Sequence, residues 1–358
     1  MDLQSKMDLI LSSPTVEVVQ SDELKTLLET NSKPVHYVGL EISGFLHLGS
    51  LMVLGSKVND LLKAGVKCKV FLADWHSIIN EKLGGDWEKI LVASNYYEEA
   101  FQFFCPGVEI VRGSELYHNN DDYWKKVVLF SRHVTLARDT RCLQIMGRKE
   151  SDALHVAQYL YPPMQAVDIN ELGVDIAHAG LDQRKIHMLA REVFPKMKWK
   201  VPVALHTALL AGLLEPEKTE SAGEDGKFDK VVACKMSKSK PDTAIFIHDT
   251  TAEITRKLNG AYCPAKIVEG NPVLEIAKLI VFKQQKEFKI ERPEKFGGNV
   301  TFASFDELAT QFAEGKVHPM DLKKSVARDV DKLVAPIRGH FEKKKDLLEV
   351  YNQAKITR

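Results

Sequence analysis

The chain has 358 residues, with 49 basic and 49 acidic side chains, so its formal net charge at pH 7 is zero. This balance excludes a globally cationic surface, and any nucleic-acid binding must therefore depend on local clusters. Five scattered cysteines exclude a zinc ribbon and a disulfide framework, because none of them forms a C-x-x-C pair. The sequence contains neither a membrane-spanning apolar run nor a secretory signal, so we expect a cytoplasmic protein that binds no membrane.

The elements predicted along the first part of the chain alternate between strands and helices. Apolar residues at helical spacing end at Gly65, a typical helix end, and a second apolar stripe predicts a helix that Asp182 can cap. This alternation predicts an α/β fold with a Rossmann-like, doubly wound parallel sheet, whose ligand crevice lies at the carboxyl ends of the strands. The buried strands are predicted at 35–41, 67–75, 108–113, 174–180 and from 201 onwards.

The remaining segments complete the predicted organisation. Residues 1–34 are expected to form an N-terminal helical segment, and the Rossmann-like domain is expected at 35–218. The polar, glycine-containing stretch 215–230 predicts an exposed loop or hairpin. From residue 246 to 358 the apolar pattern becomes helical, which predicts an all-α C-terminal domain.

Two short motifs point to chemistry. The turn EISGFLHLGS at 41–50 lacks the Lys and Ser or Thr of a P-loop, but it places His47 and Gly49 at a helix start, where backbone amides and the helix dipole favour an anion. In CKMSKSKPD, Lys235 and Lys238 can stabilise the charge on a departing pyrophosphate. Taken alone, the first motif equally fits a structural turn and the second a solvated charge run.

Together these motifs resemble the two signatures of the class I aminoacyl-tRNA synthetases. The segment 161–192 is similar to that of tyrosyl-tRNA synthetases of the archaeal and eukaryotic type, and the likeness extends over nearly the whole chain. Ser50 departs from the family, whose first signature often has a second histidine there. The resemblance implies catalytic roles for His47, Lys235 and Lys238. It also implies an ATP site formed by Gly39, Glu41, His47, Gly49, Gly180, Asp182, Lys235, Met236, Ser237, Lys238 and Ser239.

The same resemblance implies a site for tyrosine. Tyr37 and Asp168 are expected to bind the phenolic hydroxyl, and phenylalanine would leave both without a hydrogen bond. Without the surrounding motifs, Asp168 would be interpreted as a helix-surface carboxylate and Tyr37 as a half-buried strand residue. The other residues of the implied set are Phe71, Ala73 and His76, which would line the ring pocket, and Tyr161, Gln165 and Gln183, which would hold the amino group.

The implied activity is tyrosine–tRNA ligation in two steps. The carboxylate of tyrosine attacks the α-phosphorus of ATP to give tyrosyl-AMP and pyrophosphate, with Mg²⁺ and the loop lysines offsetting negative charge. The 3′-terminal ribose of tRNA(Tyr) then accepts the tyrosyl group. Neither step needs a protein nucleophile, so positioning and electrostatics would supply most of the catalysis. No protein-held metal site is predicted.

The resemblance further implies how tRNA is bound. The region 246–358 would be the anticodon-binding domain, 219–245 the KMSKS loop region, and an inserted connective region near 115–155 would form a homodimer interface. Stacking on aromatic planes is the usual way in which a splayed RNA base is held. The implied tRNA contacts are Arg184 and Lys185 at the acceptor stem and Phe296, His318 and Asp321 at the first anticodon base. The alternative is that these residues are core or first-turn positions.

Three competing functions share part of these features. A tryptophanyl-tRNA synthetase has the same signatures, but Tyr37 with Asp168 favours a phenol over an indole. A catalytically silent RNA-binding or regulatory protein would not need the intact KMSKS motif. A small-molecule nucleotidyltransferase of the same superfamily would not need the large C-terminal helical region.

Overall fold

The computed structural model describes residues 1–147, 155–215, 232, 234–238 and 241–353. The chain forms two compact units, each assembled from separate segments. Unit 1 comprises Met1–Gly44, Lys57–Ala208 and Asp346–Arg358, and unit 2 comprises Phe45–Ser56 and Leu209–Lys345. The His47 motif and the KMSKS motif thus belong to the same compact unit. The expected functional domain limits remain predictions.

Unit 1 is built around a six-stranded sheet with the order β1-β6-β5-β2-β3-β4. The predicted α/β class and all five predicted strands are confirmed. A sixth strand, β1, lies in the segment that was expected to be helical; it is short, bears a register shift and pairs antiparallel with β6 at the sheet edge. The strands are β1 (Thr15–Val19), β2 (Val35–Glu41), β3 (Lys67–Ala73), β4 (Glu109–Arg112), β5 (Ile176–Gly180) and β6 (Val203–Thr207).

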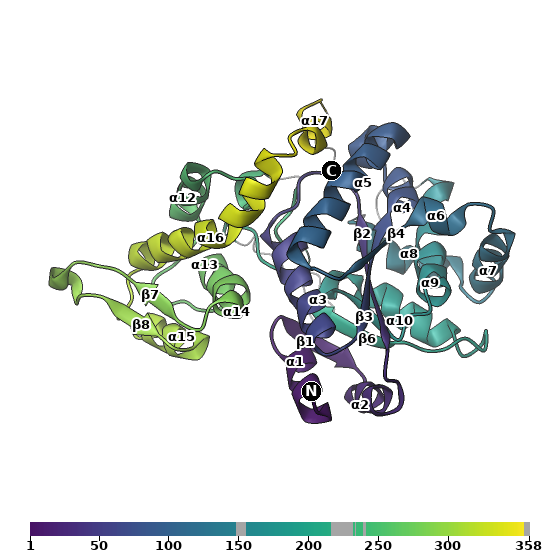
Figure 1. Cartoon of the computed structure of the whole chain (residues 1–358), viewed down its shortest axis with the longest axis horizontal. Coiled ribbons are helices and arrows are strands. Elements are labelled where there is room, and N and C mark those ends of the chain that lie inside the picture. The colour runs from purple at the N-terminus through teal and green to yellow at the C-terminus, as the bar shows by residue number, and fades with distance from the viewer. Residues whose placement is uncertain (148–154, 216–231, 233, 239–240, 354–358) are drawn as a thin grey trace. The chain divides into compact units, whose positions relative to one another are not determined.

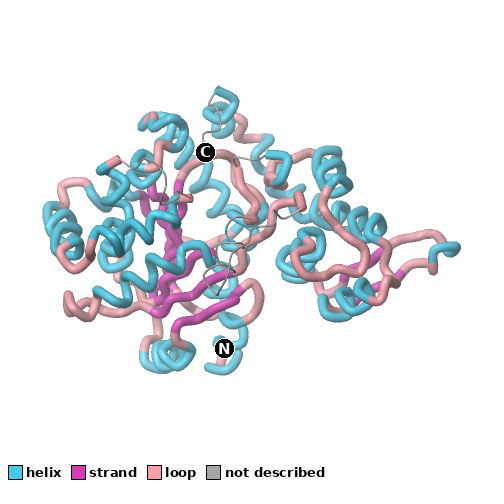
Figure 2. The backbone as a smooth tube through the Cα atoms, turned by 180° about the vertical axis from the view of Figure 1, so that it is seen from behind, coloured by secondary structure: helices cyan, strands magenta, loops and turns pink. Residues whose placement is uncertain are grey.

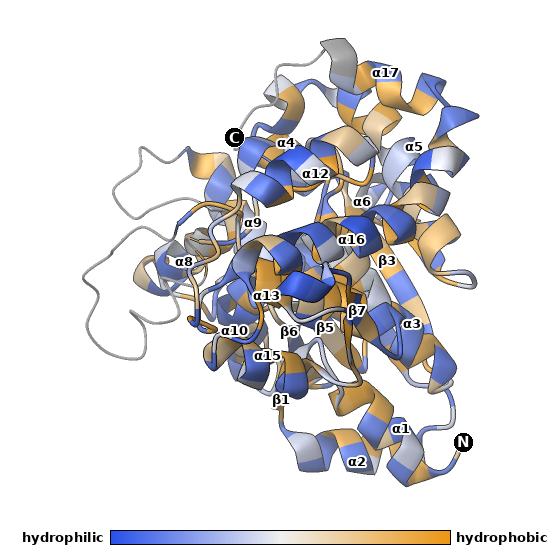
Figure 3. Cartoon of the chain, turned by 90° about the vertical axis from the view of Figure 1, so that its left-hand side faces the viewer, coloured by the Kyte–Doolittle hydropathy of each residue, from blue (hydrophilic) through white to orange (hydrophobic). Residues whose placement is uncertain are grey.

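Helices cover both faces of this sheet: α3 and α5 lie on one side, and α9 and α10 on the other (Figures 1 and 2). Both hydrophobic and hydrophilic residues are visible on α1 and α2 (Figure 3), as expected for helices that bury one side. No helix within the described ranges is both long and apolar enough to cross a membrane. The helices are α1 (Leu3–Leu11), α2 (Ser21–Thr30), α3 (Leu54–Lys63, which begins in unit 2), α4 (Asp74–Ile79), α5 (Trp87–Phe104), α6 (Gly113–Tyr117), α7 (Asp121–Ser131), α8 (Leu136–Cys142), α9 (Tyr161–Glu171), α10 (Arg184–Val193) and α17 (Asp346–Gln353).

The middle of the sheet contains its topological switch point. The chain proceeds from β2 through β3 to β4 in one direction, whereas β5 and β6 extend the sheet in the other direction. The strands β2 and β5 are parallel neighbours, with Val38 opposite His178. In open sheets of this kind, ligands bind in the crevice beyond the carboxyl ends of the strands at the switch point. The residues that follow β2 and β5 therefore define where a site is expected.

Unit 2 is mainly helical but is not all-α. Its strands β7 (Phe288–Ile290) and β8 (Val300–Phe302) form an antiparallel pair. The all-α expectation missed this pair because each strand is only three residues long. In β7, Phe288 and Ile290 are buried and Lys289 is exposed, and an alternation over three residues is too short to be recognised in the sequence. The helical elements are η1 (Gly49–Val53), α12 (Thr251–Gly260), α13 (Pro272–Ile276), η7 (Ala277–Val281), α14 (Phe282–Gln284), η8 (Glu294–Phe296), α15 (Phe305–Ala313) and α16 (Pro319–Glu342).

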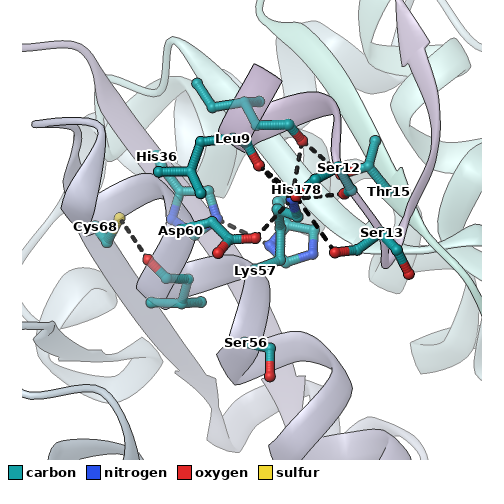
Figure 4. A network of polar contacts seen from close by, with 12 residues as sticks. Leu9, Ser12, Ser13, Thr15, His36, Ser56, Lys57, Asp60, Cys68 and His178 are labelled. Atoms are coloured by element: carbon teal, nitrogen blue, oxygen red, sulfur yellow. Dashed lines mark hydrogen bonds and ion pairs between the residues drawn. The ribbon is translucent and has the colours of Figure 1, made fainter. Parts of the chain in front are cut away.

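A buried lysine ties the first helix of unit 1 to α3 (Figure 4). The Lys57 side chain is completely buried, and its Nζ donates hydrogen bonds to the carbonyl oxygens of Leu9, Ile10 and Ser12 at 3.0, 2.9 and 2.9 Å. The same ammonium group forms a 2.8 Å ion pair with Asp60. Because α1 ends at Leu11, these carbonyls at its C-terminus lack helical partners, and the cation satisfies them.

We therefore expect Lys57→Met to destabilise the protein strongly. Removal of the ammonium leaves a buried Asp60 carboxylate without its cation, which typically costs about 3 to 5 kcal/mol. Urea denaturation followed by circular dichroism would measure the loss in the free energy of unfolding. The matched control is Lys63→Met on the same helix, where the side chain is exposed. Equal stability of both variants would contradict this account.

Candidate active site

Asp168 lies on α9 with no exposed surface. Its Oδ1 accepts hydrogen bonds from the hydroxyls of Tyr117 and Tyr123 at 2.9 and 2.8 Å. Its Oδ2 is buried and has no hydrogen-bond partner among the described residues. Burial raises the pKa of Asp168 well above its ordinary value, and the two phenol hydrogen bonds oppose that rise. The alternative of a helix-surface carboxylate is therefore wrong.

Aromatic side chains surround the free oxygen of Asp168. The Nε2 of His76, on α4, lies 3.7 Å from Oδ2, and burial lowers the pKa of His76 to about 3, so its imidazole is neutral. The Tyr161 ring meets the His76 ring edge to face, with 4.4 Å between centroids. The rings of Tyr37 and Phe71 lie 6.1 Å apart. The unpaired Oδ2 of Asp168 is thus buried among aromatic side chains.

Tyr37 is almost fully buried, so it is not the half-buried strand residue of the alternative interpretation. Burial, and then the negative charge of Asp168, raise the pKa of its phenol. A Cβ on Gly39, two residues along β2, would lie 2.5 Å from the Tyr37 hydroxyl. A glycine at position 39 is thus required by the close approach of the Tyr37 side chain, whatever its role towards ATP.

The three residues expected to bind an amino group are also brought together in unit 1. Gln165 Nε2 donates to Gln183 Oε1 at 3.3 Å, and Gln183 Nε2 donates to the carbonyl of Ile145 at 3.0 Å. The Tyr161 hydroxyl donates to Glu41 Oε1, at the end of β2, at 3.3 Å. The Oε1 of Gln165 is buried and lacks a partner within the part of the chain that the structure describes. It can therefore accept a hydrogen bond from a ligand.

In unit 2, His47 is held by its own turn. Its Nδ1 accepts from the backbone N–H groups of Gly49 and Ser50 at 3.1 and 3.3 Å, so the ring proton is placed on Nε2. Burial, and then the positive charges of Lys238 and Lys235, lower the pKa of His47 to about 3. The ring is therefore a neutral donor. A Cβ on Gly49 would lie 3.1 Å from His47 Cε1, a tight contact that a side chain at position 49 would relieve only by shifting the His47 ring.

Ser50 has a local structural role in this turn. Its Oγ accepts from the His47 backbone N–H at 2.9 Å and donates to the His47 carbonyl at 3.1 Å. The residue that replaces the second signature histidine is thus satisfied by the backbone that positions His47.

The KMSKS motif pairs with neighbouring segments of unit 2. The backbone N–H of Met236 donates to the carbonyl of Leu210 at 2.6 Å, and that of Gly212 donates to the carbonyl of Cys234 at 2.8 Å. The His47 turn is joined to the segment just after the motif, because Leu48 donates to the carbonyl of Ile245 at 3.0 Å. The ATP residues that lie in unit 2 are therefore part of one connected arrangement. Ser239, also expected to contact ATP, lies outside the described residues.

The remaining expected ATP residues follow the other central strand of unit 1. Gly180 is the last residue of β5, and Asp182 lies in the 3₁₀ turn η5 (Leu181–Gln183). The N-cap of α10 is Gln183 and makes no side-chain cap bond, so the expected capping role of Asp182 is wrong. Asp182 instead lies inside the 3₁₀ turn, whose N-cap is Gly180 and which continues directly into α10.

A family model described as tRNA synthetases class I (W and Y) matches residues 29–335. The chain belongs to this family. It is 48% identical to a tyrosine–tRNA ligase from Thermococcus sibiricus over the full length of both chains. The crystal structure of tyrosyl-tRNA synthetase complexed with L-tyrosine from Pyrococcus horikoshii matches with a TM-score of 0.93 and 44% identity, covering 99% of this chain and 100% of that chain. The predicted resemblance to archaeal tyrosyl-tRNA synthetases is confirmed.

Two further solved structures mark the extent of the likeness. The Archaeoglobus fulgidus tyrosyl-tRNA synthetase, complexed with L-tyrosine, matches with a TM-score of 0.84 at 40% identity, covering 94% of this chain and 99% of that chain. The tryptophanyl-tRNA synthetase of Plasmodium falciparum matches with a TM-score of 0.65 at 15% identity, covering 98% of this chain and 90% of that chain. The second likeness shows a shared fold alone.

The residues of this synthetase that are expected to contact the anticodon differ in their exposure and in their hydrogen-bond partners. Phe296 is 60% exposed, with Lys295 Nζ 5.0 Å from its ring centroid, so it is not core. Arg292 links its loop to the turn before α16, since it donates to the carbonyls of Gly298 and Lys316, each at 2.8 Å. His318 is the N-cap of α16, where its Nδ1 accepts from Met320. Asp321 follows in the first turn of that helix.

At the expected acceptor-stem position, Arg184 already has an intramolecular partner. Its Nε donates to both carboxylate oxygens of Glu17, at 3.0 and 2.9 Å. The same carboxylate lies 2.7 Å from His206 Nδ1. The ion pair with Glu17 thus accounts for the position of the Arg184 side chain. The tRNA contacts of Arg184 and Lys185 remain predictions.

The buried neutral histidines predict a loss of stability in mild acid. Burial lowers the pKa of His36, His47 and His76 to about 3, whereas an unfolded imidazole titrates near 6.5. Below about pH 6.5 the unfolded chain binds protons that the folded chain does not, so the free energy of unfolding falls by about 1.4 kcal/mol per pH unit for each such histidine. Urea denaturation at several pH values would measure the slope.

An NMR titration of the histidine side chains tests the same pKa values directly. In the folded protein, the ¹³Cε1 resonances of these three histidines should not shift between about pH 8 and pH 5. A titration near 6.5 in the folded state would contradict both the burial argument and the predicted slope.

Proposed function

We propose that this synthetase activates tyrosine with ATP, giving tyrosyl-AMP and pyrophosphate, and then transfers the tyrosyl group to the 3′-terminal adenosine of tRNA(Tyr). The observation that carries the choice of amino acid is the buried Oδ2 of Asp168, which has no partner among the described residues. The phenol of tyrosine can donate to that oxygen. Phenylalanine would leave the buried acceptor unsatisfied, which is costly in a site closed to water.

The other side chains of the pocket support the same substrate. The buried phenol of Tyr37 is close enough to Asp168 for that carboxylate to raise its pKa, and Gln165 Oε1 is available to an ammonium group. The neutral His76 adds no charge that would compete for the carboxylate. The tyrosine–tRNA ligases among the relatives, at 45 to 48% identity over their full length, support this assignment over tryptophan.

ATP would be held by the other set of expected residues. A neutral His47 can donate from Nε2 to a phosphate oxygen, and Lys235 and Lys238 carry positive charge close enough to lower the pKa of His47. Such groups act most strongly on the charge that develops as pyrophosphate leaves. Gly49 begins η1, and its backbone N–H donates to His47 Nδ1, which leaves the Nε2 proton of His47 for the nucleotide.

Mg²⁺ is proposed to enter with ATP, bound through the phosphates. Within the described residues, no group of three or more His, Cys, Asp or Glu side chains is arranged to hold a metal. Mg²⁺ in nucleotide sites commonly keeps several waters and uses one or two carboxylates with the phosphates. The ion would neutralise phosphate charge, while the side chains of the protein orient the tyrosine carboxylate towards the α-phosphorus.

The cellular setting and the assembly belong to the same proposal. ATP and tRNA are found in the cytoplasm, so we place the enzyme there. A homodimer is supported by exposed apolar side chains on the connective segment, since Val128 on α7 is 63% exposed and Leu136 on α8 is 67% exposed. Trp124 instead packs against the core cluster of unit 1. Sedimentation equilibrium returning the mass of a single chain would refute the dimer.

The activation step is tested by ATP–pyrophosphate exchange with tyrosine, phenylalanine and tryptophan. We expect exchange with tyrosine alone, and none after EDTA treatment. Asp168→Asn should lower kcat/KM for tyrosine by about a hundredfold because the phenol acceptor loses its charge, and Lys238→Ala should lower kcat by a similar factor. Lys278→Ala, an exposed lysine in the same unit, is the matched control and should leave both constants unchanged.

Each outcome of this experiment separates the competing functions. Exchange with tryptophan would assign the chain to the tryptophanyl branch. A folded protein without exchange for any amino acid would favour the silent RNA-binding function.

Transfer to tRNA is tested through Phe296. We expect Phe296→Ala to lower kcat/KM for tRNA(Tyr) by about tenfold to a hundredfold, because loss of one base-stacking contact typically costs about 1 to 3 kcal/mol. Exchange in the absence of tRNA should not change. The matched control is Phe103→Ala, another exposed phenylalanine, on α5 of unit 1. An unchanged kcat/KM for tRNA would exclude Phe296 from anticodon recognition.

A further inference from the structure

Two tyrosines that the expected site does not include donate to the same oxygen of Asp168. The hydroxyls of Tyr117 and Tyr123 lie 2.9 and 2.8 Å from Oδ1, and both side chains are buried. A carboxylate oxygen has two lone pairs, and these two donors occupy both of them. The second oxygen, Oδ2, is left as the acceptor for another molecule.

Hydrogen bonds at the start of α6 fix the position of Tyr117. Asp74 accepts hydrogen bonds from the backbone N–H and the hydroxyl of Ser114, the shortest at 2.6 Å, and so anchors the start of α6. A Cβ on Gly113 would lie 2.6 Å from Asp74 Oδ1, so the contact requires glycine. Because α6 ends at Tyr117, this anchor sets the place from which the phenol reaches Asp168.

Tyr123 is fixed in a similar way. Asn120 Oδ1 accepts from the Tyr123 backbone N–H at 3.1 Å, and Asn120 Nδ2 donates to the carbonyl of Leu116, next to Tyr117, at 3.0 Å. The two phenol rings pack with centroids 4.5 Å apart. The Tyr123 hydroxyl also lies 3.3 Å from the carbonyl of Met164, but the Asp168 contact is shorter by half an ångström.

We propose that Tyr117 and Tyr123 are positioning residues for phenol recognition, which hold Oδ1 of Asp168 so that Oδ2 alone accepts the hydroxyl of the amino acid. The inference rests on the proposed function, because it assigns how that pocket distinguishes tyrosine from phenylalanine. Without the two donors, the carboxyl group can turn about its Cβ–Cγ bond. The Oδ2 atom is then no longer held in one position to accept the hydroxyl of the amino acid.

The charges around Asp168 explain why two donors are needed. Its other close neighbours offer no positive charge, since His76 on α4 is neutral, and Asp74 and Glu171 repel the carboxylate. The phenol hydrogen bonds favour the ionised form of the carboxyl group, so their loss would raise the pKa of Asp168 further. A protonated Asp168 would be a weaker acceptor for the ligand.

The test compares Tyr117→Phe and Tyr123→Phe with the unchanged protein in ATP–pyrophosphate exchange. Each variant removes one hydroxyl and keeps the ring. We expect kcat/KM for tyrosine to fall about tenfold in each variant, mainly through KM, because a hydrogen bond to an ionised group is lost. The constants for ATP should stay unchanged, and so should the much slower exchange that a high enzyme concentration makes measurable with phenylalanine, so the preference for tyrosine over phenylalanine falls by the same factor.

The matched control is Tyr159→Phe, a partly buried tyrosine that packs against the same core cluster. It should keep the full preference for tyrosine. A purely structural role for Tyr117 and Tyr123 predicts equal losses for tyrosine and phenylalanine, and that result in folded protein would overturn the inference. If one variant does not fold, the preference of the other decides. An unchanged protein without tyrosine-dependent exchange would instead overturn the proposed function and, with it, this inference.

Discussion

The buried carboxylate of Asp168 is the constraint on which the amino-acid pocket depends. A charge with no exposed surface is expensive unless hydrogen bonds compensate it. Two phenol hydroxyls donate to one of its oxygens, and the other oxygen has no hydrogen-bond partner among the described residues. The elements α4, α6, α7 and α9 each contribute a side chain to this arrangement.

The two compact units use the same device to place an aromatic ring. In unit 1 the Tyr37 hydroxyl lies 2.5 Å from where a Cβ on Gly39 would be, and in unit 2 the His47 Cε1 lies 3.1 Å from where a Cβ on Gly49 would be. Each glycine stands two residues after the ring that it accommodates. The absence of a side chain thus lets each ring lie close to the backbone that follows it.

The structure also changes how several sequence patterns are interpreted. The edge strand β1 was expected to be helical and β7 and β8 were not expected, because short strands leave little periodicity. The tRNA contact expected for Arg184 competes with an ion pair to Glu17, a partner 167 residues away, in which Nε is shared between both carboxylate oxygens. For Phe296 the exposed ring agrees with a binding role, since a core position would be buried.

The sequence by itself determined the five parallel strands β2 to β6 and the helices that alternate with them, since apolar periodicity is a local property. It also determined the family, since the KMSKS motif and the HLG motif are each a continuous run of residues. It also identified Asp168, but only through resemblance. Only the tertiary structure decided which side chains donate hydrogen bonds to that carboxylate. Tyr117 and Tyr123 lie 51 and 45 residues before Asp168, and hydrogen bonds across such distances leave no spacing in the sequence from which they could be predicted.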